Sequence, residues 1–418
     1  MNIDLKLSIP KTGDYDLIVV GGGVAGVAAA VNASRLGLNT LLIEKSVNLG
    51  GLATTGLVNF FVPMCNGRGT QIIKGMAEEM LQLSKKYSFD TVPSDWQTGE
   101  PGEGKTMQRY PCRYSAPIYM LALTEFLSES GADLLLDTVL CDVVCENGRI
   151  KGVITNGKSG FQYYEAKMFI DASGDSDLLH LAGVPTVQGK NYHTYYAFGT
   201  NLENCQKAIS EGDVAHLYKM YPGGKANLYG KFHPDGHRYW LGTSNRDVTD
   251  YIVENQLELL SNIKGDNRKE RDITILPAMP QLRTTRRIDG DYTLCEDDVY
   301  RHFDDSVGAI CDFDRRDYLY EIPFRCLTKS GYPNVIAAGR CASGTGYAWD
   351  VLRVIPPAII TGQASAAACF IALRDNESIC NVNIKELQAL LEGQNVMIHF
   401  DDSLIKEDGG EKADIGHI

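Results

Sequence analysis

The segment that most constrains this fold is a glycine run that follows an apolar stretch. Residues 16–26 read DLIVVGGGVAG, which fits the pattern G-x-G-x-x-G at Gly21, Gly23 and Gly26. The first glycine permits a tight turn, the second lets the backbone approach a pyrophosphate, and the third lets a helix pack on the strand. The following residues predict a helix over 24–36, whose N-terminal amides would point at the phosphates.

A second apolar stretch and an acidic residue complete this pattern. Residues 39–43 predict a strand, and Glu44 follows it roughly 20 residues past the glycines, where an acid commonly binds a ribose hydroxyl. The glycines alone are a weak signal, but strand, glycines, helix, strand and acid together predict a bound adenine dinucleotide. The alternative is an ordinary tight turn between a strand and a helix in an unrelated α/β protein.

Length, charge and cysteines limit the class of protein. The 418 residues are enough for two or three domains. The net charge of -13 argues against nucleic acid or an anionic membrane as a partner, because both select clustered Lys and Arg. The eleven cysteines show no C-x-x-C or other metal-ligand spacing, so we expect reduced thiols and no metal site. We find no signal peptide and no run of about 18 apolar residues, which predicts a cytoplasmic protein.

The rest of the chain alternates between helical and strand patterns. Helices are expected over residues 69–87, 115–130, 203–220, 247–264, 355–374 and 383–392. Strands are expected over residues 133–136, 139–144, 150–155, 161–166, 167–171 and 332–338. Asn-Gly pairs at 147–148 and 156–157 predict hairpin turns, and with them a small antiparallel meander.

Four segments in this order carry a resemblance to a known family. They read VGGGVAG at 20–26, LGGLAT at 49–54, IDASGD at 170–175 and NVIAAGR at 334–340, the last continuing to RVIPP at 353–357. Together they resemble the FAD-dependent oxidoreductases of the glutathione-reductase-like superfamily. The segment RTTRRIDG at 283–290 is similar to the R-x-T-R-R-I-x-G segment of a bacterial branch. The resemblance covers residues 15–395.

The resemblance implies an α/β fold with two domains. One is a Rossmann-like FAD-binding domain with a parallel sheet and a small antiparallel β-meander, and the other is an inserted α+β substrate domain. We predict residues 15–183 and 326–400 as the two parts of the FAD-binding domain and 184–325 as the substrate or cap domain. Residues 401–418 would form a loosely ordered tail.

The resemblance also implies which residues hold FAD. The pyrophosphate would meet Gly21, Gly22, Gly23, Ala25 and Gly26, and the adenosine half would meet Glu44, Lys45, Leu140, Ser173, Gly174 and Asp175. The ribityl chain and flavin would meet Gly50, Gly51, Leu52, Ala53, Thr54, Gly339, Arg340, Pro357, Ala358 and Ile359. Many relatives have Gly-Asp where this chain has Gly339 and Arg340, so the backbone turn is implied there and the polar contact is not. A helix that begins near Pro357 would stabilise reduced flavin through its dipole.

Four residues are candidates for the chemistry. Arg353 would anchor a carboxylate or stabilise an oxyanion, and its alternative role is a structural pair with Asp350. Tyr347 would donate a proton or form a pocket wall. His193, among aromatic residues, would line the substrate pocket or serve only in packing. Arg286 would face the substrate or form an ion pair.

We therefore predict an FAD-dependent oxidoreductase that transfers a hydride between a small organic substrate and flavin N5. It would have no NAD(P)H domain of its own, because the sequence contains no second G-x-G-x-x-G. The alternatives are a flavin monooxygenase or halogenase, and a flavin-holding subunit that exchanges electrons with a partner protein. An NAD-dependent dehydrogenase would not explain the doublet Gly50-Gly51. The electron acceptor and a possible homo-oligomer stay open.

Overall fold

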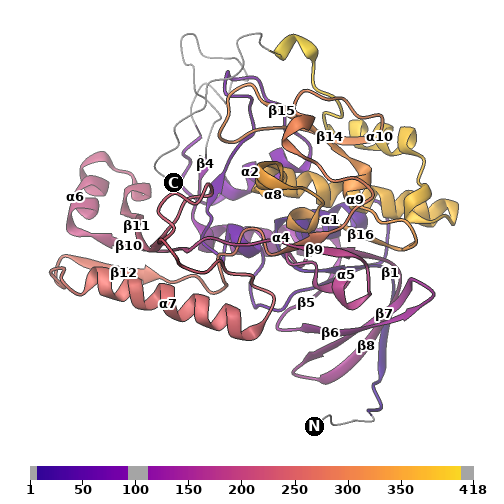
Figure 1. Ribbon diagram of the computed structural model, residues 1–418, viewed down its shortest axis with the longest axis horizontal. Coiled ribbons are helices and arrows are strands. Elements are labelled where there is room, and N and C mark those ends of the chain that lie inside the picture. Colours follow the sequence, from indigo (N-terminus) through magenta and orange to yellow (C-terminus); the bar gives the residue numbers. More distant parts are fainter. Residues whose placement is uncertain (1–6, 93–111, 406–418) are drawn as a thin grey trace.

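The computed structural model describes residues 7–92 and 112–405, and its centre is a seven-stranded sheet (Figure 1). The strands β5 (Asp133–Leu135), β2 (Thr40–Ile43), β1 (Lys11–Val20) and β8 (Gly160–Asp171) lie side by side in this order and are parallel. Strand β16 (Val335–Ala337) adds in parallel to the C-terminal end of β8. All carboxyl ends of these strands therefore meet at one edge, where open α/β sheets bind their ligands.

Strand β8 is long enough to pair with two strands along the same edge, with β16 near its C-terminal end and with β7 near its start. Its residues 160–165 pair with β7 (Arg149–Gly157) in antiparallel register, and β7 pairs with β6 (Val139–Glu146). The predicted meander is therefore confirmed. Asn147 and Gly148 both have positive φ, as the first predicted turn requires. The second turn is at residues 158–159, so the pair 156–157 ends the strand instead of forming the turn.

Helices cover the face of the sheet that carries the larger hydrophobic core. This core unites α1 (Val24–Arg35), α2 (Met76–Lys86), α4 (Ala116–Ser130) and α9 (Ile355–Asp375). Within the described residues, α9 alone is long and apolar enough to cross a membrane, but 94% of its apolar window is buried inside the fold. It is thus placed as a core helix, and the cytoplasmic location stays a prediction.

Two elements at the edge of this core differ from the sequence prediction. The helix predicted over 69–87 begins at Met76, because Gly75 has a φ of 62° that a right-handed helix excludes. Residues 346–353, for which we predicted no helix, form α8 (Gly346–Arg353). The remaining short strands of this part are β3 (Phe60–Phe61) and β4 (Cys112–Arg113), and the short α5 (Asp177–Leu181) covers the other face.

The segment after residue 184 projects to one side of this body (Figure 1). A three-stranded antiparallel sheet joins β11 (Lys219–Lys225), β10 (Thr194–Asn201) and β12 (Arg271–Ile275), and α7 (Asn245–Ile263) packs on it. The helix predicted over 203–220 was too long. Helix α6 (Leu202–Glu211) ends at Gly212, whose left-handed φ of 66° caps the helix.

Two further strand pairs return the chain to the core. Strand β13 (Arg286–Ile288) pairs with β9 (Thr186–Gln188), and β14 (Ser306–Cys311) pairs with β15 (Leu319–Pro323). Residues of β14 and β15 belong to the same hydrophobic core as α9, and α10 (Ile384–Gly393) packs beside them. The division at residue 325 stays a prediction. Of the predicted tail, residues 406–418 lie outside the described residues.

Candidate active site

The glycine loop between β1 and α1 has the shape of an anion cradle. A Cβ on Gly21 would overlap the carbonyl of Ala172, and a Cβ on Gly26 would overlap the carbonyl of Gly21. A Cβ on Gly23 would have no atom of the described chain within 4 Å. No described side chain caps α1, and its first turn carries no acid. The first amides of α1 are therefore free to bind a pyrophosphate in the open space at Gly23.

The glycine doublet lies directly on this loop, although the two segments are far apart in sequence. The Gly50 N–H donates to the carbonyl of Gly22 over 2.8 Å, and Gly23 and Gly50 form a parallel bridge. A Cβ on Gly51 would lie 3.1 Å from the Cα of Gly23. Gly51–Ala53 form a short 3-10 helix, and the hydroxyl of Thr54, directly after it, donates to the carbonyl of Leu49 over 2.6 Å. The two glycine sites thus form one continuous backbone surface.

Glu44 directly follows β2, beside the same loop, and its residue is 8% exposed. Its Oε2 accepts from the Gly22 N–H over 2.6 Å, and its Oε1 accepts from the Ser46 N–H over 2.7 Å. Each oxygen keeps a lone pair for a ribose hydroxyl. The Glu44 carbonyl accepts from the Thr138 N–H, which brings the start of β6 and Leu140 to this end. Lys45 is exposed.

Arg340 occupies the position that is Asp in many relatives, and its side chain fastens three segments together. Its Nε donates to the carbonyl of Gly174 over 2.6 Å and its Nη2 to Asp175 over 2.8 Å. Its Nη1 donates to the carbonyl of Leu282, in the inserted segment. The Arg340 side chain is buried and engaged in these bonds. The predicted contact of this segment with the cofactor therefore depends on the backbone turn at Gly339, whose φ is 68°.

Arg286 lies beside the same adenosine-side segment. Its Nε donates to the carbonyl of Asp175 over 2.7 Å, and its Nη2 forms an ion pair with Asp177 over 2.8 Å. Burial raises the pKa of Asp177, as does the charge of Asp175, and the Arg286 guanidinium opposes this rise. The structure thus gives Arg286 the ion-pair role that the sequence left open, and a contact with substrate stays a prediction.

Arg353, the first candidate for chemistry, also has an acidic partner. Its Nε donates to Asp350 over 2.8 Å, and its Nη2 contacts the same oxygen. Burial lowers the pKa of Arg353, the Asp350 carboxylate raises it, and the charges of Arg283 and Arg340 lower it further. Three guanidinium groups therefore lie close enough to interact. Of these, Arg283 has an Nη1 that is buried and has no hydrogen-bond partner among the described residues.

The inserted segment holds the stretch that follows the glycine doublet. The Tyr196 hydroxyl donates to the carbonyl of Leu57 over 3.3 Å, and the Gln281 amide donates to the carbonyl of Gly56 over 2.8 Å. Leu57 has a φ of 62°, a strained value for a non-glycine residue. The sequence prediction missed Tyr196 and Gln281. No motif marks them, since their role depends on contacts across more than one hundred residues.

The start of α9 differs from a plain helix N-terminus. No described side chain caps it at Val354, and Pro356 and Pro357 supply no N–H. The Ala358 N–H already donates to the Val354 carbonyl. Any stabilisation of reduced flavin by residues 357–359 would therefore come from the helix dipole more than from free amides.

Tyr347 lies on α8 and is buried against aromatic rings. Its hydroxyl donates to Asp312 over 2.6 Å, and its ring stacks on Tyr229 with the centroids 5.7 Å apart. Burial and the Asp312 charge raise the pKa of Tyr347 well above its usual range. The phenol therefore stays protonated at neutral pH, and its proton points to Asp312. His193 lies elsewhere, and its polar partners Glu258, His233 and Asn255 all belong to the inserted segment.

A hollow of about 650 Å³ at the other end of the sheet is not this site. Its lining includes Asp14, Asn39 and Lys167. Asp14 and Asn39 lie at the amino-terminal side of β1 and β2. Ligands of open α/β sheets bind at the carboxyl ends, so we place the active site at the glycine loop and the arginine cluster.

A comparison with known families decides what this cradle is for. The model of a family described as FAD dependent oxidoreductase matches residues 16–223 and 245–391. The chain belongs to this family. As an FAD-dependent oxidoreductase, it uses FAD as its cofactor, and the free amides of α1 and the open space at Gly23 fit the FAD pyrophosphate. The narrower assignment to one bacterial branch stays a prediction.

This chain matches only part of the length of each curated relative reported below. A digeranylgeranylglycerophospholipid reductase 2 of Methanothermobacter thermautotrophicus is 29% identical over 178 residues, which is 41% of this chain and 43% of that protein. A digeranylgeranylglycerophospholipid reductase of Methanocella arvoryzae is 28% identical over 283 residues, 64% of this chain and 66% of that protein. A solved geranylgeranyl bacteriochlorophyll reductase-like protein of Thermoplasma acidophilum has a TM-score of 0.46 and 18% identity, covering 91% of this chain and 84% of its own.

Proposed function

We propose that this oxidoreductase transfers a hydride between flavin N5 and a small organic substrate that carries an anionic group. FAD, when bound, supplies the hydride chemistry, and the chain supplies binding and proton groups. The observation that carries the proposal is the Arg283 Nη1, which is buried without a hydrogen-bond partner in the described part of the chain.

An anionic partner would stabilise the half-buried Arg283. A buried charged donor without a partner costs free energy, whereas a carboxylate or phosphate would form a charge-assisted hydrogen bond with it. The neighbouring Arg340 and Arg353 already have Asp175 and Asp350 as partners. Three guanidinium groups thus meet two carboxylates, and one positive charge is left for an anion. Arg283 would bind this anion and thereby orient the substrate.

Tyr196 is the candidate proton group next to this anion site. Its phenol contacts the carbonyl of Leu57, in the segment that follows Gly50 and Gly51. Burial, partly offset by the charges of Arg283 and Arg113, raises the pKa of Tyr196 to about 12. Its hydroxyl is therefore protonated at neutral pH, and the nearby guanidinium groups would stabilise the phenolate after proton donation. Tyr347 is the second candidate, through its hydrogen bond to Asp312.

The test is anaerobic bleaching of the flavin absorbance with matched pairs of compounds. Each pair would contain an acid and its neutral amide or ester, drawn from hydroxy acids, amino acids and sugar acids. We expect bleaching by members of an acid series and at least tenfold slower bleaching by their neutral partners. Equal bleaching by acids and neutral partners would contradict the anionic substrate. Bleaching by none of them, with reduction by a co-purified protein, would favour a flavin-holding subunit.

A further inference from the structure

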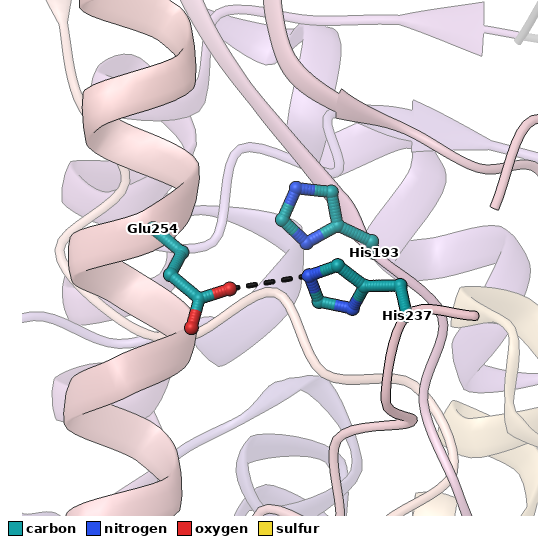
Figure 2. Close-up of side chains that lie close together, drawn as sticks. All are labelled: His193, His237 and Glu254. Carbon is teal, nitrogen blue, oxygen red and sulfur yellow. Dashed lines mark hydrogen bonds and ion pairs between the residues drawn. The ribbon is translucent and has the colours of Figure 1, made fainter. Parts of the chain in front are cut away.

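Two contacts between histidine and glutamate lie side by side in the inserted segment, and Figure 2 shows three of the residues, His193, His237 and Glu254. Glu254 and Glu258 lie one turn apart on α7 and so point the same way. The Nε2 of His237 lies 3.2 Å from Glu254, and the Nε2 of His193 lies 2.8 Å from Glu258. The two imidazole rings are 4.7 Å apart. One ligand atom each of His193, His237 and Glu254 lies within 4.8 Å of the others.

The hydrogen bonds of His237 define which nitrogen faces Glu254. Its Nδ1 lies 2.9 Å from the carbonyl of Arg238, so this nitrogen carries the hydrogen. In the neutral ring the Nε2 is then an acceptor, and it faces a carboxylate oxygen, which is also an acceptor. Two acceptors at this distance need a cation between them, either a proton or a metal ion. A histidine whose other nitrogen donates to a carbonyl has the orientation that metal sites use.

The surroundings hold the two histidines in place, and the Asn255 amide lies 3.5 Å from the Nδ1 of His193. His233 accepts from the His193 N–H through Nδ1 over 3.1 Å, and its Nε2 lies 3.3 Å from the carbonyl of His237. Both nitrogens of His233 are thus engaged, and burial lowers its pKa, so this ring is neutral at pH 7. Asn191 and Trp240 form an antiparallel bridge that joins the two histidine-bearing loops. The ligands therefore come from fixed backbone on three sides.

We propose that His193, His237 and Glu254 bind a divalent transition metal ion of the zinc type. Two imidazole nitrogens and one carboxylate oxygen are a ligand set that zinc uses with its fourth position open, whereas calcium and magnesium prefer oxygen alone. Glu258 contacts the Nε2 of His193 and would act as its outer partner. Arg238, which lies 4.0 Å from Glu254, has Asp250 as a closer partner at 3.2 Å. The ion would link α7 to the loop that leads into β10.

His302, Glu321 and His399 form a second group of the same residue types, and it differs from the proposed metal site. His302 and His399 both contact Glu321, at 2.6 and 3.0 Å, and His302 also contacts Asp402 at 2.8 Å. The Asp402 and Glu321 carboxylates raise the pKa of His302, so both of its nitrogens donate as an imidazolium. An imidazolium does not bind metal. This group is an ion-pair network, and it supplies an internal control.

The experiment is a metal titration of the FAD-loaded protein after treatment with a chelator. We expect one equivalent of zinc to bind, and cobalt to give the visible bands of a four-coordinate site at wavelengths longer than those of flavin. His237→Gln and Glu254→Gln should weaken zinc binding by more than about a hundredfold, because loss of even an outer partner costs about 10–100-fold. His216→Gln should leave it unchanged, since His216 forms a single exposed contact with Glu211, 2.7 Å long.

Three results would overturn the proposal. One is no zinc binding at micromolar concentration, and another is binding that persists in His237→Gln. The third is binding that is lost in His399→Gln but kept in His237→Gln, which would place the ion at Glu321. Flavin content and circular dichroism identify a variant that fails to fold. Glu258→Gln then provides the independent test: its side chain is 40% exposed, so its replacement creates no cavity, and loss of its contact with His193 should weaken zinc binding by about 10–100-fold.

Discussion

The FAD cradle and the arginine cluster are built from different parts of the chain. The cradle is backbone: free amides of α1, the open space at Gly23, and the doublet at Gly50 laid against it. The arginine cluster is side chain: Arg283 comes from the inserted segment, and Arg340 and Arg353 come from the C-terminal part. A backbone site needs glycine at fixed spacings, whereas the segments that contain these arginines do not tell what each guanidinium group contacts. The cofactor is therefore evident from sequence and the substrate is not.

The largest effect is expected from Gly26→Ala. The new Cβ would overlap the Gly21 carbonyl, which cannot move without breaking the turn at the end of β1. We expect loss of FAD binding, measured as flavin absorbance per protein, and destabilisation beyond the roughly 1–3 kcal/mol of ordinary overpacking. Gly265→Ala is the control, because its Cβ would meet no described atom within 4 Å. Normal FAD content in Gly26→Ala would refute the backbone account of the cradle.

Arg340→Met tests the residue that joins the cradle to the inserted segment. The change leaves Asp175 without its buried partner and removes the bonds to Gly174 and Leu282. We expect the free energy of unfolding to fall by about 3–5 kcal/mol, measured by chemical denaturation. The exposed Arg374, replaced in the same way, should leave the free energy of unfolding nearly unchanged. Equal effects of the two changes would mean that Arg340 is not a structural fastener.

Tyr196→Phe tests the side-chain region alone. Among the described residues the phenol has one hydrogen bond, to the Leu57 carbonyl, so its loss should cost only about 1 kcal/mol of stability. If Tyr196 donates the proton, the rate of flavin bleaching should fall by about a hundredfold with FAD content unchanged. Tyr347→Phe is the matched variant, because it removes the other candidate phenol. A large effect at Tyr347 and none at Tyr196 would exchange their roles.

The smallest effect is expected at His302, which contacts Glu321 and Asp402. Asp402 and Glu321 raise its pKa above the ordinary value of 6.5. The contribution of the His302 ion pairs to the free energy of unfolding is therefore complete below pH 6.5, and it is lost as the pH rises through the raised pKa. Because the side chain is 41% exposed, we expect His302→Gln to cost less than about 1 kcal/mol at low pH and less still at high pH. Thermal melts from about pH 5 to about pH 9 would measure this, and a difference that grows with pH would contradict it.

Local sequence signals predicted the parts of the fold that local physics determines. The turn at Asn147 and Gly148 and the bounds of α7 are two examples, the latter within two residues of prediction. Errors arose where a single backbone angle sets the limit of a helix, at Gly75 before α2 and at Gly212 after α6, because the spacing of apolar residues does not report φ. The side-chain site was only partly predicted. That Arg353 pairs with Asp350 was foreseen as one of two roles, but the contacts of Tyr196 and the arrangement of His193 depend on tertiary packing.

The most direct test of the anionic-substrate account is the acid preference of Arg283→Met. The ratio of bleaching rates for one acid and its neutral amide would be measured in the wild-type protein, in Arg283→Met and in Arg374→Met, at equal FAD content. We predict that Arg283→Met lowers the rate for the acid by at least tenfold and leaves the rate for the amide unchanged, because only the acid uses the free guanidinium group. A ratio that is the same in all three proteins would contradict the assignment of Arg283 as the anion-binding group.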